Sequence, residues 1–394
     1  MVHEVVRRVE ELSDRLRKVS GETEALGRLS DESVRVVREA GVMRLLQPPE
    51  HGGYAAHPRD FAEAVMAVSK ACGSTGWVCG VGGVHPWEMA LMDQRLQQEV
   101  WGEDPDTWIA SPYAPTGIAD RVDGGYRLTG RWQFSTGTDH CDWIFLGALV
   151  GDGDGGLAQP VTVLHVVLPR ADYTIVPDSW DVIGLCGTGS KDIIVDGAFI
   201  PGYRTIDVAQ VSAGAVAAER AGRSEAVYKL PFWSIFPLGI TSAVIGICEG
   251  ALDAHLDYQR SRISAAGRKL KEDPYSLYAI SEASADIAGA RVQLIDGISR
   301  MHDKLEAGES VTLEERALMR RDQTRCAWRA VAAADQLFQR SGGNAARKGN
   351  VMQRFWRDAH VGLQHAIHIP GDIYHASAQI EMGLEPGAGL MPLI

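Results

Sequence analysis

The histidines near the C-terminus are the residues whose spacing most directly suggests chemistry. In the segment RFWRDAHVGLQHAIH, a continuous helix would place Asp358, His365 and His368 on one face. Imidazole titrates near neutral pH, so such a face could transfer a proton. A metal site would need a further ligand, for which His375 is available. Because paired histidines are common, the pattern favours a structural histidine or a proton-transfer role for His365 over a metal site.

Hydroxyl side chains gather in the strand-rich stretch from residue 126 to residue 201. From Tyr126 onward, apolar residues alternate with polar ones, which predicts a half-buried strand. The apolar face is formed by Tyr126, Leu128, Trp132 and Phe134, and the polar face includes Ser135. A glycine-rich loop further along carries Thr188 and Ser190. Two glycine-flexed segments with hydroxyl groups in one β-module suggest a surface for a flat ligand with polar edges.

Helical patterns flank this β-module on both sides. Residues 1–110 read as helices, one of them beginning at Ser30 and another after Pro58. Residues 205–230 read as an alanine-rich connector. An apolar helix follows, then an amphipathic helix with a and d positions and two more helices at about 320–340 and 354–368. The pattern predicts an α+β chain with helices at 1–110, a β-barrel at 111–220 and a four-helix bundle at 221–394.

Composition narrows the class of partner and the compartment. The formal net charge is −12, which disfavours nucleic acid and an anionic membrane as main partners. The six cysteines form no CxxC pair, as expected in a reducing cytoplasm. The first residues lack the apolar region of a signal peptide, and the longest apolar runs are shorter than a membrane span requires. A cytoplasmic protein without a membrane segment is therefore expected.

A literal G-x-G-x-x-G occurs at Gly151, Gly153 and Gly156, but its context is unsuitable for a dinucleotide. A dinucleotide-binding loop must follow a strand and open a helix, whereas this one leads into the strand-like run VTVLHVVLP. The aspartates between the glycines would also repel a pyrophosphate. The motif predicts a hairpin connection, and reducing power from a nicotinamide would have to arrive from outside the chain.

Four motifs carry a resemblance to a known family over nearly the whole chain. They are Trp132–Gly137 (WQFSTG), Gly187–Pro201 (GTGSKDIIVDGAFIP), the turn Gln339–Gly343 and the run Arg354–Asp358 (RFWRD). Together they are specific, and the chain resembles the acyl-CoA dehydrogenase superfamily. The resemblance implies a flavin held between a β-barrel and a helix bundle, usually in a homotetramer.

Within that superfamily the chain is most similar to the oxygenase components of two-component flavin monooxygenases. The segments RLLQPPEHGGY, CGSTGWVCGVGGVHPW and SPYAPTGIADRVDGGYRLTGRW resemble hydroxylases of a secosteroid phenol and, more distantly, the oxygenase of p-hydroxyphenylacetate hydroxylase. Ile373-Tyr374-His375-Ala376 stands where many dehydrogenases carry a Tyr-Glu-Gly motif with the catalytic glutamate. The residues after His365 also differ from the Asn-Asp-Pro segment of the steroid hydroxylases. The first departure weakens the dehydrogenase interpretation, and the second weakens the steroid one.

The resemblance implies ortho-hydroxylation of a phenol, of a polycyclic or steroid-derived type, through a C4a-hydroperoxyflavin. His365 would accept the phenol proton, and we expect Asp358 or local dipoles to favour its charged form. Ser135 would donate a hydrogen bond near flavin N5, with Ser111 and His85 close to the peroxide and the ring.

The resemblance also assigns the cofactor and the partners. The side chains expected to bind the polar edges of the flavin ring are Trp132, Ser135, Thr136, Thr188 and Ser190. Arg262 is expected to bind the phosphate or the ring of the flavin. Reduced FMN or FADH2, with FMN preferred, and O2 would be cosubstrates, delivered to a homotetramer by an NAD(P)H:flavin reductase. Three alternatives stay open: an acyl-CoA dehydrogenase with bound FAD, a flavin-dependent N-oxygenase of an amine or amino sugar, and a non-catalytic scaffold.

Overall fold

A computed structural model describes residues 2–264 and 267–394, and it combines helices with one β-sheet. Six helices precede the main strands: α1 Glu4–Leu26, α2 Asp31–Ala40, α3 Pro58–Ala71, α4 Gly73–Gly82, α5 His85–Met89 and α6 Gln94–Trp101. The predicted start of α2 is confirmed, because the Ser30 side chain accepts a hydrogen bond from the Ser33 N–H and so caps the helix. The helix predicted after Pro58 is α3, which has Pro58 in its first turn.

Helix α4 is buried along its whole length, and its glycines explain how it packs. Gly80 lies against the backbone of Gly239 in helix α9 (Phe232–Ser261), and a Cβ at Gly80 would lie 2.5 Å from the Gly239 carbonyl oxygen. A side chain at either position would force the two helices apart. The small residues around Gly76 therefore permit a close helix–helix contact in the centre of the molecule.

The strands form one eight-stranded sheet. They are β1 Ile109–Ala110, β2 Gly117–Val122, β3 Gly125–Ser135, β4 Trp143–Gly151, β5 Val163–Pro169, β6 Thr174–Ile175, β7 Lys191–Pro201 and β8 Thr205–Asp207. The hydrogen-bonded order is β6-β7-β3-β2-β4-β5-β8, with the short β1 parallel to β4. Among the described residues, β6 and β8 lie at the two ends of this order and are not hydrogen-bonded to each other. The sheet therefore does not close into the predicted barrel.

Strand β3 departs from simple alternation at its C-terminal end. Its pairing with β7 shifts register between Trp132 and Ser135, and Phe134 adopts a φ of +67°. This bulge turns the Phe134 ring outward, to 64% exposure, and buries Ser135 completely. The strand itself was predicted, but Phe134 was wrongly placed on the buried face and Ser135 on the open one. A period of two cannot anticipate an inserted residue.

The segment containing Gly151, Gly153 and Gly156 connects strands, as predicted. Strand β4 ends at Gly151, which bridges to Leu157 across the loop. The Asp152 carboxylate accepts the backbone N–H groups of Asp154 and Gly156, at 2.9 and 2.8 Å. Its side chain therefore organises a tight turn of the chain itself.

Four helices pack into a bundle: α9, α10 Pro274–Glu306, α11 Leu313–Arg340 and α12 Val351–Leu363. The predicted core positions of α10 are confirmed, since Ile287, Leu294, Ile298, Met301 and Leu305 are all buried. Helix α9 is long and apolar enough to cross a membrane, which the prediction from apolar runs did not anticipate, but 89% of its most apolar window is buried inside the structure. It is the central helix of the bundle.

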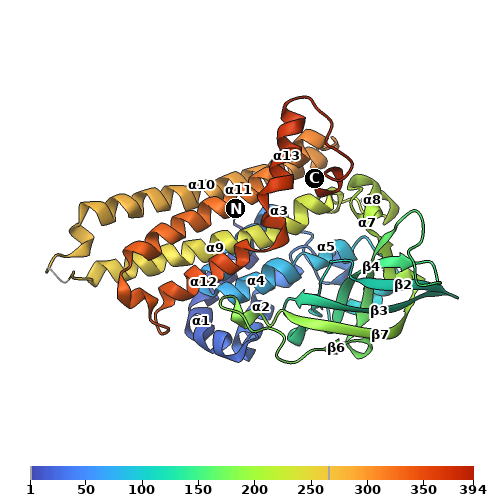
Figure 1. Cartoon of the computed structure of the whole chain (residues 1–394), viewed down its shortest axis with the longest axis horizontal. Coiled ribbons are helices and arrows are strands. Elements are labelled where there is room, and N and C mark those ends of the chain that lie inside the picture. The colour runs from blue at the N-terminus through green and yellow to red at the C-terminus, as the bar shows by residue number, and fades with distance from the viewer. Residues whose placement is uncertain (1, 265–266) are drawn as a thin grey trace.

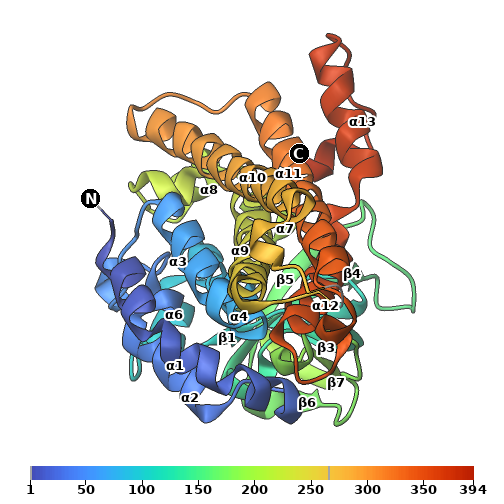
Figure 2. The same cartoon turned by 90° about the vertical axis from the view of Figure 1, so that its left-hand side faces the viewer.

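The C-terminal region differs from the prediction in two ways. Helix α12 ends at Leu363 instead of continuing to residue 368, and His365 caps a short 3-10 helix, Ala366–His368. A further helix, α13 Pro370–Glu381, projects from the bundle (Figures 1 and 2). The predicted connector at 205–230 contains β8 and two short helices, α7 Val208–Val211 and α8 Ala215–Arg220.

The sheet lies at one end of the bundle, and the N-terminal helices pack alongside both (Figures 1 and 2). Helix α4 contacts α9 and α12 of the bundle, α5, strand β1 and the 3-10 helix Cys186–Thr188 of the β-region. It therefore borders several segments that carry or adjoin predicted site residues, among them those of His85 and Thr188.

Candidate active site

The predicted hydroxyl residues Ser135, Thr136, Thr188 and Ser190 form one buried group, called here the hydroxyl cluster. Ser190 Oγ lies 3.0 Å from Thr136 Oγ1 and 2.7 Å from Thr188 Oγ1. The Gly137 N–H donates to the Thr188 carbonyl at 2.9 Å, which joins the end of β3 to the glycine-rich loop. The two segments that the sequence singled out therefore meet in space.

Ser135 differs from its neighbours because its hydroxyl is unsatisfied. The side chain is fully buried, and Ser135 Oγ has no hydrogen-bond partner among the described residues. A buried hydroxyl without a partner is unfavourable by about 1–3 kcal/mol. A bound group with polar edges, such as a flavin ring, would supply the missing partner, so the hydroxyl cluster fits the cofactor that the resemblance implies.

Trp132 does not face this cluster with its side chain. The indole is fully buried, and its Nε1–H donates to the Gly147 carbonyl at 2.8 Å. The ring also fills the space beside Gly117 and Gly130, where a Cβ would lie 2.1 and 2.8 Å from its atoms. The structure makes Trp132 a core residue of the β-sheet instead of a direct ligand of the cofactor.

Arg262 lies elsewhere in the chain. It follows α9, which ends at the end of the bundle remote from the strands (Figure 1). Its guanidinium donates to the Arg340 carbonyl at 2.9 Å and packs against Gly342. Within one chain, Arg262 therefore contacts the motif Gln339–Gly343 and lies away from the hydroxyl cluster. The prediction had placed both in one shared site.

His85 and Ser111 form a hydrogen-bonded pair, as the predicted site requires. His85 is buried and its Nδ1 lies 2.6 Å from the Ile109 carbonyl, so Nδ1 carries the proton. Nε2 is then an acceptor, and the Ser111 hydroxyl donates to it at 2.7 Å. Burial lowers the pKa of His85 to about 4. The pair is consequently neutral at physiological pH.

A group of aromatic side chains packs beside this pair, with Tyr113 and Phe145 at 5.7 and 5.9 Å from the His85 ring. Tyr113 packs edge-on against Phe232 and Phe236, at 5.7 and 5.3 Å between ring centroids, and lies 5.8 Å from Phe145. Phe236 also lies 6.4 Å from His365. We call Tyr113, Phe145, Phe232 and Phe236 the aromatic cage. It connects the His85 side of the site to the His365 side.

The base of the cage contains a buried polar pair that sequence reasoning missed. Glu88 Oε1 lies 2.6 Å from His165 Nδ1, and both side chains are almost fully buried. Tyr113 stacks on the His165 ring at 4.3 Å. Burial, followed by the charge of Glu88, raises the pKa of Tyr113 far above its usual range. Glu88 three residues after His85 was the one available signal, since this spacing shares a helical face.

His365 lies partly exposed in the loop after α12, 5.9 Å from the Trp77 ring of α4. The Ile367 N–H donates to His365 Nδ1 at 3.3 Å, so the neutral ring carries its proton on Nε2. Burial and the nearby charge of Arg320 lower the pKa of His365 to about 4. The expectation that local charges favour the imidazolium is therefore wrong.

Asp358 and His368 do not share a helical face with His365, because α12 ends between them. Asp358 Oδ1 accepts the Leu185 N–H at 2.6 Å. His368 is buried between the Thr241 hydroxyl and the Gly362 carbonyl, at 3.1 and 3.2 Å. His375 lies on α13. The helix that would have gathered these residues into a metal site is interrupted.

A different group has potential metal ligands close together. Atoms of His57, His302 and Asp303 lie within 4.8 Å of one another. However, His57 Nδ1 accepts the Arg59 N–H at 3.0 Å, which keeps the proton on Nε2. That Nε2–H donates to Asp303 at 3.2 Å, so the nitrogen facing the group is a donor and a poor metal ligand.

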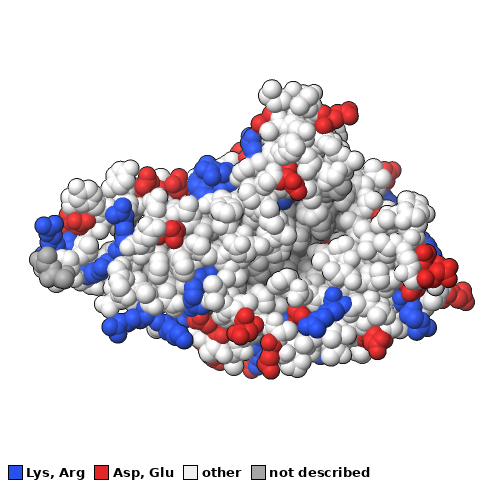
Figure 3. Space-filling view, viewed as in Figure 1, with Lys and Arg blue, Asp and Glu red and all other residues white. Residues whose placement is uncertain are grey.

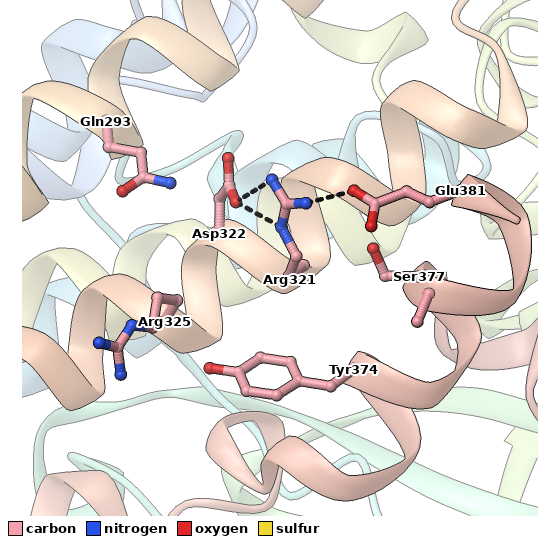
Figure 4. Close-up of a pocket in the computed structure, with 8 residues that line it drawn as sticks. Gln293, Arg321, Asp322, Arg325, Tyr374, Ser377 and Glu381 are labelled. Carbon is pink, nitrogen blue, oxygen red and sulfur yellow. Dashed lines mark hydrogen bonds and ion pairs between the residues drawn. The ribbon is translucent and has the colours of Figure 1, made fainter.

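A pocket of about 420 Å³ between α10, α11 and α13 contains none of the predicted site residues (Figure 4). Its Arg321 is held between Asp322 and Glu381, and Tyr374 points toward Arg325. Its charged residues Arg321, Asp322 and Glu381 are therefore paired with one another. By contrast, Figure 3 shows an uncharged hollow between α13 and the strands, in the region where Figure 1 places α4 and α5.

Comparisons with known proteins agree with this geometry. Residues 238–370 match the family model "Acyl-CoA dehydrogenase, C-terminal domain". The pigment production hydroxylase of Rhodococcus erythropolis is 50% identical over 100% of both chains. HsaA of Rhodococcus jostii, the oxygenase subunit of a flavin-dependent monooxygenase, is 42% identical over 96% of this chain and 98% of its own.

The solved structure of 3-HSA hydroxylase from Rhodococcus sp. RHA1 superposes with a TM-score of 0.92, at 42% identity and 99% coverage of both chains. The mixture of helices and sheet, the hydroxyl cluster and these full-length similarities agree with one another. The chain belongs to the oxygenase components of flavin-dependent monooxygenases, which share an acyl-CoA dehydrogenase-like fold.

Proposed function

We propose that this protein hydroxylates a phenol at the position ortho to its oxygen, using reduced flavin and O2. Reduced flavin bound at the hydroxyl cluster would supply the two electrons that activate O2, so that one oxygen atom enters the phenol and the other leaves as water. The observation that carries the proposal is the placement of His365, with its proton on Nε2, on the far side of the aromatic cage from the neutral His85–Ser111 pair. A flat aromatic substrate bound between them would contact all three groups.

His365 acts in this proposal as a hydrogen-bond donor to the phenol oxygen. A group with a pKa of about 4 is a poor acceptor for the proton of a phenol, whose pKa is near 10. The positive charge of Arg320 that disfavours imidazolium favours a phenolate at the same place. The Nε2–H then stabilises the negative charge, which makes the ring electron-rich and reactive toward the activated oxygen.

His85 and Ser111 keep the opposite side of the site neutral. Because the Ser111 hydroxyl donates to His85 Nε2, its oxygen lone pairs remain available to accept a hydrogen bond from the reacting oxygen. The aromatic cage excludes water, which protects the activated oxygen from release as hydrogen peroxide. Ser135, Thr136, Thr188 and Ser190 are assigned to the polar edges of the flavin.

The remaining assignments concern the assembly. We favour FMN over FAD, an NAD(P)H:flavin reductase as the source of reduced flavin, and a cytoplasmic location. Arg262 can reach a flavin only if another copy supplies it, so its role depends on the proposed homotetramer. The division into an N-terminal helical part, a central β-region with an open sheet and a bundle belongs to the same proposal. Light scattering of the purified protein tests the tetramer.

The test mixes the purified protein with chemically reduced FMN or FAD and oxygenated buffer containing a phenol, and measures hydroxylated product and hydrogen peroxide. We expect ortho-hydroxylated product at the expense of peroxide, and the matched anisole, which cannot ionise, should give peroxide alone. Product from an amine instead would favour the N-oxygenase alternative. Anaerobic reduction of bound FAD by an acyl thioester would favour the dehydrogenase alternative.

A further inference from the structure

The glycine-rich loop that carries Thr188 and Ser190 is attached to helix α12 of the bundle, and Asp358 makes one of these contacts. Asp358 is 97% buried, and its Oδ1 accepts the Leu185 N–H at 2.6 Å. Leu185 has a φ of +54°, a left-handed conformation that is unfavourable for a leucine by about 1–2 kcal/mol. A strained residue persists only where its surroundings hold it, and the carboxylate of Asp358 is one such restraint.

From Leu185 the hydrogen bonds continue into the hydroxyl cluster. The Thr188 hydroxyl donates to the Leu185 carbonyl at 2.9 Å, and the Thr188 N–H donates to the same oxygen at 3.1 Å. Thr188 then contacts Ser190, which contacts Thr136. Asp358 is therefore the first member of a continuous chain of bonds that ends at the residues assigned to the flavin.

The start of the loop is fixed from the same helix. Arg357 donates to the Ile183 carbonyl and to Glu24 of α1. Gly184 lies so close to the Arg357 carbonyl that a Cβ would be 2.5 Å from its oxygen. The loop is thus held between α1 and α12. Within the loop region Trp180 Nε1–H also donates to the Leu185 carbonyl, at 3.1 Å, whereas Asp358 is the bundle residue that bonds to Leu185.

We propose that Asp358 is a positioning residue for the flavin site: it holds Leu185 in its left-handed conformation and so sets the directions of the Thr188 and Ser190 hydroxyls. This inference rests on the proposed function, because it assumes that the hydroxyl cluster binds flavin. Asp358 itself does not contact the reacting atoms.

The surroundings of Asp358 make its charge sensitive to pH. Burial raises the pKa of Asp358 to about 6, against the favourable effects of the Leu185 N–H and of Arg357 and Arg354. Glu24 of α1 opposes ionisation, and the thiols of Cys72 and Cys186, whose pKa burial raises, also face the carboxylate. A carboxylate accepts an N–H more strongly than a protonated carboxyl does. Flavin affinity should therefore fall as the pH falls through about 6.

The test measures binding of reduced FMN by anaerobic calorimetry to the wild type and to three variants. Asp358→Ala removes the acceptor, and we expect binding weaker by roughly ten- to hundred-fold. Asp358→Asn keeps an oxygen acceptor without a titratable charge, so it should weaken binding less. Asp335→Ala is the matched control, because Asp335 also accepts one hydrogen bond from α12, from Trp356 at 2.8 Å, but belongs to the bundle. It should bind as the wild type does.

The pH dependence supplies a readout that a merely structural role would not move. Between pH 8 and pH 5 the affinity of the wild type should fall more than that of Asp358→Asn, since titration of the flavin itself is common to both. Thermal unfolding of each variant without flavin shows whether it is folded. Equal affinity in the wild type and Asp358→Ala, or identical pH profiles in the wild type and Asp358→Asn, would overturn the inference. Failure of the wild type to bind reduced flavin would instead refute the proposed function.

Discussion

Replacing His365 tests whether this residue acts as a hydrogen-bond donor or as a general base. Transfer of the phenol proton to His365 crosses about six pKa units, from near 10 to about 4, which corresponds to about 8 kcal/mol. In the donor role the phenol proton instead leaves to solvent, which near pH 7.5 costs about 2.5 pKa units, or about 3.4 kcal/mol. A hydrogen bond from Nε2–H to the phenolate offsets about 1.5–3 kcal/mol of this cost, as expected for a bond to a charged group. The donor role is therefore favoured by the magnitudes.

His365→Ala should lower kcat/KM for hydroxylation by about ten- to hundred-fold, because only the donor is lost. His365→Gln restores an N–H close to the position of Nε2 and should recover part of this loss. Both variants lose the bond that caps residues 366–368, so their thermal stabilities are compared first. Peroxide released without product should rise as hydroxylation falls.

The pH profile completes the test. With a donor, kcat rises with pH as the bound phenol ionises, and His365→Ala shifts this rise upward by about one to two pH units. With a base, activity instead appears as His365 loses its own proton, and Gln and Ala are equally inactive. Equal loss in both variants, together with a wild-type profile that follows an imidazole, would refute the donor role.

Three further outcomes follow from buried polar groups. Ser135→Ala should leave the flavin-free protein at least as stable as the wild type, because Ser135 Oγ lacks a partner in the described part of the chain, yet it should weaken FMN binding about ten-fold. Melting curves with and without FMN measure both effects, and a destabilised flavin-free variant would contradict the prediction. Glu88→Ala leaves His165 Nδ1–H unpaired and should lower the free energy of unfolding, measured with urea, by about 1–3 kcal/mol. Glu88→Gln keeps an acceptor and should lower it less, and equal losses in the two variants would contradict the prediction. Stability should also fall as the pH falls from 6.5 to 4, because burial lowers the pKa of seven histidines and the unfolded chain then binds more protons. Asp358 and Asp106, whose pKa burial raises, act in the opposite direction, and urea midpoints at several pH values test the sign. The largest shifts are those of His85, His255 and His365, with a pKa of about 4, and of His368, with a pKa of about 3; the other three are His51, His140 and His302.

The elements and the hydroxyl cluster could be predicted because they follow from local patterns. Periodicity located the core face of α10, and glycine with hydroxyl residues identified the loop at Thr188 and Ser190. The bulge at Phe134 could not be predicted, since one additional residue reverses the faces of a strand and leaves alternation apparently intact.

The tautomer and the lowered pKa of His365 also could not be predicted from the sequence. They depend on the end of α12 at Leu363, which gives Nδ1 a backbone donor, and on Arg320, a residue 45 positions earlier. The pairing of Glu88 with His165 joins an N-terminal helix to strand β5. Such contacts arise from tertiary packing, which no single-sequence pattern encodes.

Helix α9 has a consequence for how the protein is made. Its apolar surface is covered by segments that are synthesised both before and after it, including α3, α4, α11 and α12. While the ribosome is still synthesising the C-terminal third of the chain, the apolar surface of α9 is only partly buried and can bind chaperones. Chains that stop before residue 313 should accumulate as inclusion bodies.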